Sequence, residues 1–313
     1  AGLGEHGTPE LVGTAQLEGW RRVVEGVHAA GAKIFPQLWH MGVMKKSGTG
    51  PFPDYPACRP SGHWGPQGGF NVLQPEYLES VAAPTRPMTD SEIADVIHAF
   101  ARCARNARIV GFDGIAIHGA HGYLIDPFFW GDTNQRAPDA YGGDMIERTR
   151  FAVEILKAIR REIGPDMPIH FRYSQWKAQD FKARLAETPQ ALGAFLEPLA
   201  DAGVTVFDVS TRLFHLPEFE GSDLGLAGWT KKLTGKLTSA VGGVGLQKGQ
   251  FDPITKPPSS TNNLNRVIER FNRGEFDLVS VGRSLVNDPN WARRVRAGAA
   301  FLPFDPASLQ VLT

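Results

Sequence analysis

Hydrophobic residues recur along this chain with two periods, one typical of helices and one typical of short buried strands. Between residues 15 and 30, Leu17, Trp20 and Val24 fall on one helical face, and Gly31 follows as a stop signal. The same spacing returns in segments that begin at residues 89, 146, 188 and 263, each of which ends near a glycine. We therefore predict a helix in each of these five segments.

Two of the predicted helices carry residues that mark a helix start. Thr89 is followed three residues later by Glu92, so the Thr hydroxyl can cap the first turn while the Glu side chain reaches back, which is the capping-box pattern. Thr188 and Pro189 place a capping residue directly before a proline at the first helical position. Both pairs predict where their helices begin.

Short apolar runs follow or connect these helices and are predicted strands. There are six of them, namely residues 33–40, the start of 111–123, and residues 169–174, 205–210, 238–244 and 277–282. Repetition of a helix, a glycine and a short strand indicates parallel βα units in an α/β protein. A TIM (β/α)8 barrel has eight such strands. The pattern thus fits either an open doubly wound sheet or a barrel whose first two strands are absent from the chain.

The length of 313 residues suits a single barrel domain over residues 1–313. Residues 41–88 interrupt the regular pattern with a long stretch that is dense in proline and glycine. A loop of this length in a compact protein is usually functional, so we interpret residues 41–88 as an excursion loop over a site.

The charge balance argues against a highly charged partner. Lys and Arg together number 33, as do Asp and Glu, so no net charge attracts nucleic acid or an acidic membrane surface. A small-molecule substrate fits this composition better. The cysteines Cys58 and Cys103 are too few for a disulfide framework, and no apolar segment is long enough to span a bilayer. We expect a cytoplasmic protein, and the sequence leaves its oligomeric state open, a homo-oligomer included.

Polar side chains collect at the end of the second predicted strand. Its apolar start leads into His118, His121 and Tyr123. Residues three apart point to opposite faces of an extended strand, so the two histidines converge only if the backbone leaves β geometry between them. Gly119 and Gly122 permit such a turn. This cluster is therefore the strongest candidate for a catalytic site.

Two chemistries suit the paired histidines. As imidazole donors aimed at one oxygen, His118 and His121 would stabilise an enolate-like oxyanion, a contact worth about a hundredfold in rate per donor in other enzymes. Tyr123 would then act as the proton donor. As metal ligands the histidines would need a third carboxylate or cysteine, and none stands at a matching spacing. The residues favour the oxyanion interpretation, with no metal.

Two further strand ends carry side chains that have a structural as well as a functional interpretation. Gln37 offers an amide that suits the edge of a heterocycle and equally suits a loop carbonyl. Arg172 lies in an otherwise apolar strand, where its charge must meet a buried partner, and taken alone a structural salt bridge is the plainer explanation.

The last two strands end in glycine-rich motifs. Gly242 with Gly243, and Gly282 with Arg283, resemble the phosphate cradle that barrels commonly build after their last two strands. The alternative is that the glycines only form a tight turn and that Arg283 pairs with Asp288. Short glycine motifs alone do not decide between these alternatives.

Taken together, these residues resemble the old yellow enzyme family, the FMN-dependent ene-reductases and NADH:flavin oxidoreductases. The shared motifs occur in family order at residues 37–40 (QLWH), 111–114 (GFDG), 118–124 (HGAHGYL), 133–134 (TN), 141–143 (YGG), 281–283 (VGR) and 288–289 (DP). The similarity runs from about residue 10 to the C-terminus. It implies a flavin-binding barrel that alternates between reduction of FMN by NADH or NADPH and reduction of an activated alkene.

The resemblance also implies roles for single residues. Gln37 would bond the pyrimidine edge of the flavin, and Arg172 would lie by its N1 and O2 atoms. The FMN phosphate would be held by Gly242, Gly243, Gly282 and Arg283. His118 and His121 would hold the carbonyl or nitro oxygen of the substrate, and Tyr123 would protonate the carbon next to it while flavin N5 delivers hydride to the β-carbon.

The chain departs from the family pattern mainly at its front. The first two strands of the family, one of which lies along the flavin, have no counterpart, which would explain the six predicted strands. We therefore expect a shortened barrel with six of its eight strands recognisable. Two other readings remain, a non-catalytic truncated barrel that acts as a binding or assembly partner and a metal-dependent barrel hydrolase that uses His118 and His121.

Overall fold

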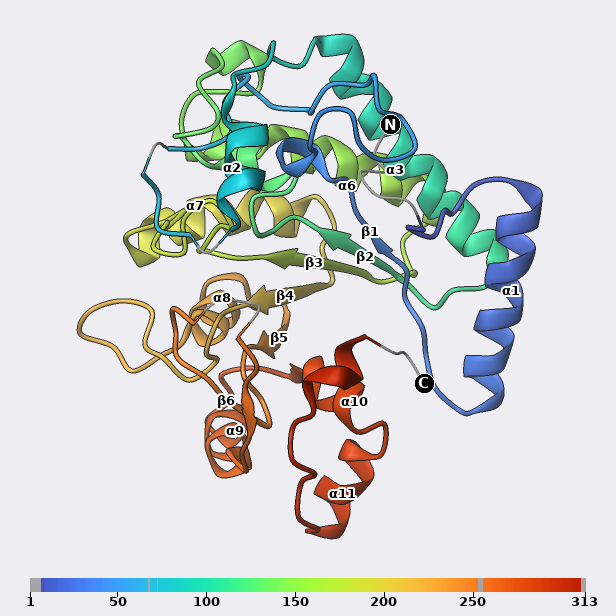
Figure 1. The fold of residues 1–313 in the computed structure, drawn as a ribbon, viewed down its shortest axis with the longest axis vertical. Coiled ribbons are helices and arrows are strands. Elements are labelled where there is room, and N and C mark those ends of the chain that lie inside the picture. The colour runs from blue at the N-terminus through green and yellow to red at the C-terminus, as the bar shows by residue number, and fades with distance from the viewer. Residues whose placement is uncertain (1–6, 67, 72, 253–255, 311–313) are drawn as a thin grey trace. The chain divides into compact units, whose positions relative to one another are not determined.

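The computed structural model describes residues 7–66, 68–71, 73–252 and 256–310. The chain divides into two compact units, Ala1–Phe207 and Asp208–Thr313, here called unit 1 and unit 2. Unit 1 contains strands β1 to β3 with helices α1 to α7, and unit 2 contains β5 to β8 with α8 to α11 (Figure 1). Strand β4 (Val206–Ser210) crosses the division.

Unit 1 is built around the parallel strands β1 (Gln37–Leu38), β2 (Ile115–His118) and β3 (Ile169–Tyr173). The register pairs His118 with Arg172, so the two residues lie side by side where β2 and β3 end. The strand predicted over residues 33–40 is shorter than expected. Pro36 has no N–H for the ladder, although its carbonyl oxygen accepts from the Ala116 N–H at 3.0 Å.

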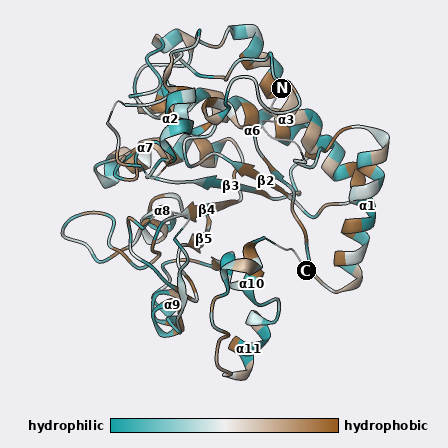
Figure 2. Cartoon of the chain, in the orientation of Figure 1, coloured by the Kyte–Doolittle hydropathy of each residue, from teal (hydrophilic) through white to brown (hydrophobic). Residues whose placement is uncertain are grey.

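Four helices of unit 1 confirm predicted segments: α1 (Thr14–Ala29), α3 (Asp90–Val110), α6 (Arg150–Ile163) and α7 (Pro189–Asp201). The capping box of α3 is present, since Thr89 Oγ1 accepts from the Glu92 N–H at 3.2 Å and Glu92 Oε2 accepts from the Thr89 N–H at 2.9 Å. Thr188 Oγ1 caps α7 by accepting from the Ala191 N–H. Hydrophobic and hydrophilic residues alternate along α1 and α3, as helices with one buried face require (Figure 2).

The remaining helices of unit 1 are short. The sequence pattern does not predict the 3-10 turns Gly42–Met44 and Pro138–Ala140 or the helices α2 (Pro75–Ala82) and α4 (Asp126–Phe129), whereas α5 (Met145–Arg148) overlaps the helix predicted from residue 146. Residues 41–88 are therefore not irregular throughout, because they contain α2. The buried Arg59 fixes this segment by donating to the carbonyl oxygens of Gly62, Val81 and Ala83. The helix predicted from residue 146 is divided into α5 and α6.

Unit 2 contains a parallel pair of strands, β5 (Leu237–Val241) and β8 (Leu278–Ser280), and a small antiparallel ribbon, β6 (Leu246–Gln247) with β7 (Ser259–Ser260). Its helices are α8 (Leu226–Thr234), α9 (Leu264–Asn272), α10 (Arg283–Asn287) and α11 (Trp291–Ala297), followed by the 3-10 turn Pro306–Leu309. The strands β5 and β8 and helix α9 confirm predicted segments, whereas β6, β7, α8 and α10 are new. No helix in the described part of the chain is long and apolar enough to cross a membrane.

Candidate active site

The backbone turns sharply directly after β2. His121 has a φ of 64° and Gly122 a φ of 79°, so two successive residues lie in the left-handed region. This turn confirms that the chain leaves β geometry between the two histidines. Gly119 has a different role from the predicted one. A Cβ at Gly119 would lie 2.5 Å from Phe171 Cζ, so the glycine allows a close approach to β3.

The turn brings the three predicted catalytic side chains together. The ring centroids of His118 and His121 are 5.0 Å apart, and those of His118 and Tyr123 are 5.2 Å apart. Two tryptophans border this cluster. Trp176 stacks on His121 with centroids 4.4 Å apart, and Trp39 meets Tyr123 edge-on at 5.2 Å. These aromatic contacts restrict the orientation of the His121 and Tyr123 rings.

His118 is the most unusual member of the cluster. The residue is 8% exposed, and neither ring nitrogen makes a hydrogen bond of ordinary geometry within the described residues, although a contact with the Ala120 main chain partly opposes the fall in its pKa. Burial, helped by the nearby charge of Arg172, lowers the pKa of His118 to about 3, so the imidazole is neutral at physiological pH. A buried polar group without a partner is costly. A ligand oxygen at this position would satisfy the ring N–H.

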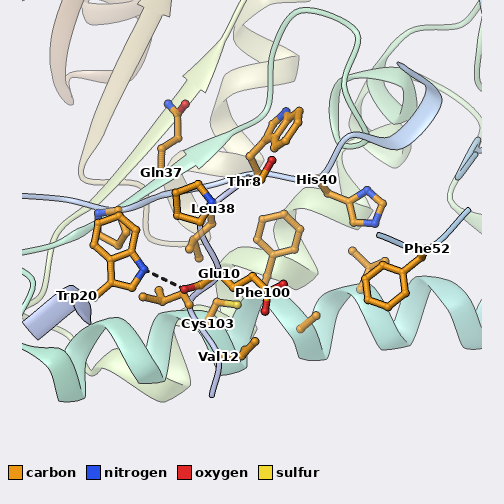
Figure 3. A pocket seen from close by; sticks show the side chains of 16 residues that line it. Thr8, Glu10, Val12, Trp20, Gln37, Leu38, His40, Phe52, Phe100 and Cys103 are labelled. Carbon is orange, nitrogen blue, oxygen red and sulfur yellow. Dashed lines mark hydrogen bonds between the residues drawn. The ribbon is translucent and has the colours of Figure 1, made fainter. Parts of the chain in front are cut away.

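Gln37 is the first residue of β1 and borders a largely apolar cavity of about 410 Å³. The cavity is formed by residues 8–12, β1 and the inner face of α3, with Trp20, Phe52 and Phe100 in its wall (Figure 3). The Gln37 side chain extends away from Trp20 and Phe100. His118, His121, Tyr123 and Arg172 do not line this cavity, whereas His40 and Trp39 do. Trp39, which meets Tyr123 edge-on, therefore lies between this cavity and the cluster of His118, His121 and Tyr123.

In unit 2, the backbone of Gly242 and Gly243 has the φ values 138° and 74°. A Cβ at Gly242 would lie 2.5 Å from the carbonyl oxygen of Thr211, so no larger residue fits there. Gly282 precedes α10, and Arg283 is its first residue. Asp288 forms its ion pair with Arg294, whose Nε lies 2.7 Å from Asp288 Oδ2. Among the described residues Arg283 thus has no ion pair with Asp288, so the predicted pairing is wrong, whereas a tight turn at Gly242 and Gly243 is consistent with their positive φ values.

Arg283 belongs to a group of cations that the sequence pattern does not reveal. Burial and then the charges of Arg212 and Arg283 lower the pKa of Lys248 to about 7. The charge of Arg283 likewise adds to the effect of burial in lowering the pKa of Arg212. Asp252 offsets this repulsion only in part. An anion bound among these three side chains would relieve their mutual repulsion.

The structure also reveals a buried ion pair behind the histidine turn. Lys177 Nζ lies 2.7 Å from Asp126 Oδ1, and both side chains are 0% exposed. The two residues stand 51 positions apart in the sequence, so no local pattern predicts their contact. The only signal is that each is a charged residue next to apolar or aromatic neighbours. Among the described residues, no group of three or more His, Cys, Asp or Glu side chains could hold a metal.

Comparisons with known proteins identify a family of flavin oxidoreductases. Residues 1–301 match the NADH:flavin oxidoreductase / NADH oxidase family. The chain is 31% identical over 294 residues to 12-oxophytodienoate reductase 2 of Arabidopsis thaliana, covering 93% of this chain and 71% of that protein. It is also 31% identical over 285 residues to the NADH oxidase of Thermoanaerobacter brockii, covering 90% of this chain and 39% of that protein.

The fold is similar to that of a solved old yellow enzyme homologue from Zymomonas mobilis. The TM-score is 0.76 at 24% sequence identity, and the match covers 100% of this chain and 80% of the other. This likeness confirms the predicted α/β barrel fold of the TIM type.

Proposed function

Given that the chain belongs to the NADH:flavin oxidoreductase / NADH oxidase family, and is thus an FMN-dependent NAD(P)H oxidoreductase of the old yellow enzyme type, we propose that it reduces activated alkenes. The substrates would be α,β-unsaturated carbonyl or nitro compounds. The relative from Arabidopsis is named 12-oxophytodienoate reductase 2, so the substrate in its name carries an oxo group and carbon–carbon double bonds.

The single observation that carries this proposal is the state of His118. Its imidazole is buried, neutral and without a well-formed hydrogen bond in the described part of the chain, and the centroids of the His118 and His121 rings are 5.0 Å apart. Two imidazoles can each donate one N–H to the same oxygen. A carbonyl or nitro oxygen would gain negative charge during reduction, so these donors bind it more strongly in the transition state.

The residues proposed to hold FMN fit that group in each unit separately. In unit 1, the half-buried Arg172 at the end of β3 supplies positive charge next to His118. In unit 2, the cations Arg212, Lys248 and Arg283 repel one another, as a site for a phosphate would. We propose that Gly242, Gly243, Gly282 and Arg283 hold the phosphate and that Gln37 and Arg172 hold the flavin ring.

FMN, when bound, supplies the hydride that the β-carbon of the alkene accepts. His118 and His121 would bind and polarise the substrate oxygen, which makes the β-carbon electrophilic. The Tyr123 hydroxyl would give its proton to the α-carbon, so that the saturated product leaves neutral. Solvent would then return a proton to Tyr123. Trp176 and Trp39 would keep the His121 and Tyr123 rings in the required orientation.

Replacing His118 by alanine tests this assignment. The His118→Ala variant should lower kcat/KM for 2-cyclohexenone about 100-fold or more, because one of two oxyanion donors is lost. The exposed His98 on α3 provides the control, and the His98→Ala variant should leave kcat/KM unchanged. Steady-state assays of both FMN-loaded variants make the comparison. Equal kcat/KM values for His118→Ala and the unsubstituted enzyme would contradict the proposal.

A further inference from the structure

The buried ion pair between Lys177 and Asp126 is not part of the proposed chemistry, yet its further side-chain bonds reach the histidine turn and the segment after β3. Asp126 Oδ2 accepts from the Gly122 N–H at 2.6 Å. Lys177 Nζ donates to the carbonyl oxygen of Ser174 at 3.0 Å. The pair therefore joins the start of α4, the turn after β2 and the segment after β3.

The segment after β3 binds both main-chain groups of His121. The His121 N–H donates to Ser174 Oγ at 3.0 Å, and the Ala178 N–H donates to the His121 carbonyl oxygen at 3.2 Å. Ser174 Oγ in turn donates to the carbonyl oxygen of Trp176 at 2.7 Å. Residues 174–178 thus form a short strap along His121, and Lys177 lies in this strap.

The strap stabilises an unfavourable backbone conformation at His121. A φ of 64° is unfavourable for a residue with a side chain, so the conformation persists only where its surroundings hold it. Here the surroundings are the Ser174 hydroxyl, the Ala178 N–H and the charge pair that ties Gly122 to residue 177. The stacked Trp176 belongs to the same strap and sets the plane of the His121 ring.

A buried ion pair is in itself weak evidence for stability, because two desolvation costs offset its attraction. Its bonds to the turn suggest a different use. We propose that Asp126, Lys177 and Ser174 are positioning residues that hold the His121 imidazole next to His118, so that both rings meet one substrate oxygen. This inference rests on the proposed function, since it assigns the pair to the same oxygen site.

The probe for this inference is 4-nitrophenol, a weakly acidic phenol whose protonated and phenolate forms differ in visible absorbance. Two N–H donors beside the charge of Arg172 should favour the phenolate. The FMN-loaded enzyme should therefore bind 4-nitrophenol with a pKa below that of the free phenol. The absorbance of the bound probe, titrated against pH, reports this shift independently of catalysis.

The first variant neutralises both partners together, Asp126→Asn with Lys177→Met, so that no single charge remains buried. The amide keeps an oxygen for the Gly122 N–H. We expect the variant to bind 4-nitrophenol about 10- to 100-fold more weakly, with the pKa of the bound probe moved toward that of the free phenol, because displaced donors lose most of their effect. A purely structural role would lower the melting temperature without moving the pKa of the bound probe.

The second variant, Ser174→Ala, removes the acceptor of the His121 N–H and buries no charge. It should move the pKa of the bound probe in the same direction. If the double variant does not fold, Ser174→Ala alone tests the positioning role. Lys231→Met is the matched control. It breaks an ion pair of the same 2.7 Å length in unit 2, with Asp277, and should leave probe binding unchanged.

The outcomes separate the two claims. If the unsubstituted enzyme binds 4-nitrophenol with a lowered pKa and His118→Ala abolishes the shift, the oxygen site is present. Unchanged probe binding and an unchanged pKa in Ser174→Ala, and in the double variant where it folds, would then overturn the positioning role alone. If the unsubstituted enzyme does not lower the pKa of the probe, the proposed function fails first.

Discussion

At the scale of single residues, the proposed site depends on backbone conformations that few side chains tolerate. His121 and Gly122 both have positive φ, and a Cβ at Gly122 would lie 1.8 Å from Gln179 Oε1. Gln179 is itself buried and donates from Nε2 to the carbonyl oxygen of Gly122 at 3.1 Å. Both the positive φ and the close packing of Gln179 therefore restrict which residues can occupy position 122.

The Gly122→Ala variant separates these two effects when it is compared with Gly221→Ala. Gly221 has a φ of 76° and open space around its Cβ position, so its replacement should cost only the left-handed conformation, about 1–2 kcal/mol. Gly122→Ala should cost clearly more, because Gln179 must also move. Denaturant unfolding of both variants measures the difference. Equal losses would show that the surroundings of Gly122 adapt freely.

The sequence predicts the central part of this site for a simple reason. His118, His121 and Tyr123 stand within six residues, so their convergence is a local property of one turn. The supporting contacts are not local. Asp126 and Lys177 meet only because β2 and β3 are neighbours in unit 1, and a charge in a loop gives no sign of its partner.

At the scale of secondary structure, the capping box of Thr89 and Glu92 determines where helix α3 begins. Its capping box satisfies N–H groups that would otherwise lack partners in the first turn. Glu92 also accepts from both terminal nitrogens of Arg86, and these bonds are the main reason why the pKa of Glu92 falls to about 2. The cap therefore stays charged at all but very low pH.

Thr89→Ala should lower the free energy of unfolding by about 1 kcal/mol, because the Glu92 N–H loses its acceptor. Thr14→Ala is the control. Thr14 begins α1, whose N-cap residue Gly13 makes no side-chain capping bond, so this change should have little effect. Chemical denaturation followed by circular dichroism provides both values. A loss for Thr14→Ala as large as that for Thr89→Ala would count against the role of the cap.

The elements that the sequence predicts are those with a full buried face or a distinct start. Helices α3 and α7 have both, and their bounds agree closely with the predicted ones. Helix α2 spans only Pro75–Ala82 and buries one residue, Val81, so it leaves no periodic signal. Strands β6 and β7 have two residues each, which is too short for any alternation.

At the scale of the whole molecule, two buried histidines make stability depend on pH. Burial lowers the pKa values of His40 and His118 to about 3 in the folded chain, against 6.5 for an ordinary histidine. His40 Nδ1 also accepts from the Gly42 N–H at 3.0 Å, a bond that requires the unprotonated nitrogen. Both side chains must therefore stay neutral in the fold.

Stability should accordingly fall on acidification. Below pH 6.5 the unfolded chain binds protons at these histidines and the folded chain does not, so the contribution is complete above pH 6.5 and is lost progressively toward pH 3. Each group should contribute up to about 1.4 kcal/mol per pH unit in this range. Unfolding free energies measured between pH 7 and pH 5 should show a smaller slope for His118→Gln than for the unsubstituted chain. The exposed His98→Gln should keep the full slope, and equal slopes for all three proteins would refute the assignment.

The most direct measurement concerns the FMN-loaded enzyme without oxygen. NAD(P)H should bleach the flavin absorbance, and 2-cyclohexenone should restore it while one equivalent of cyclohexanone forms. His118→Ala should still bleach with NAD(P)H, but its recovery with the enone should be about 100-fold slower. Two results would contradict the claim that the histidine pair activates the alkene by binding the carbonyl oxygen conjugated to it. One is a flavin that bleaches and does not recover with the enone, and the other is a flavin that recovers equally fast in His118→Ala.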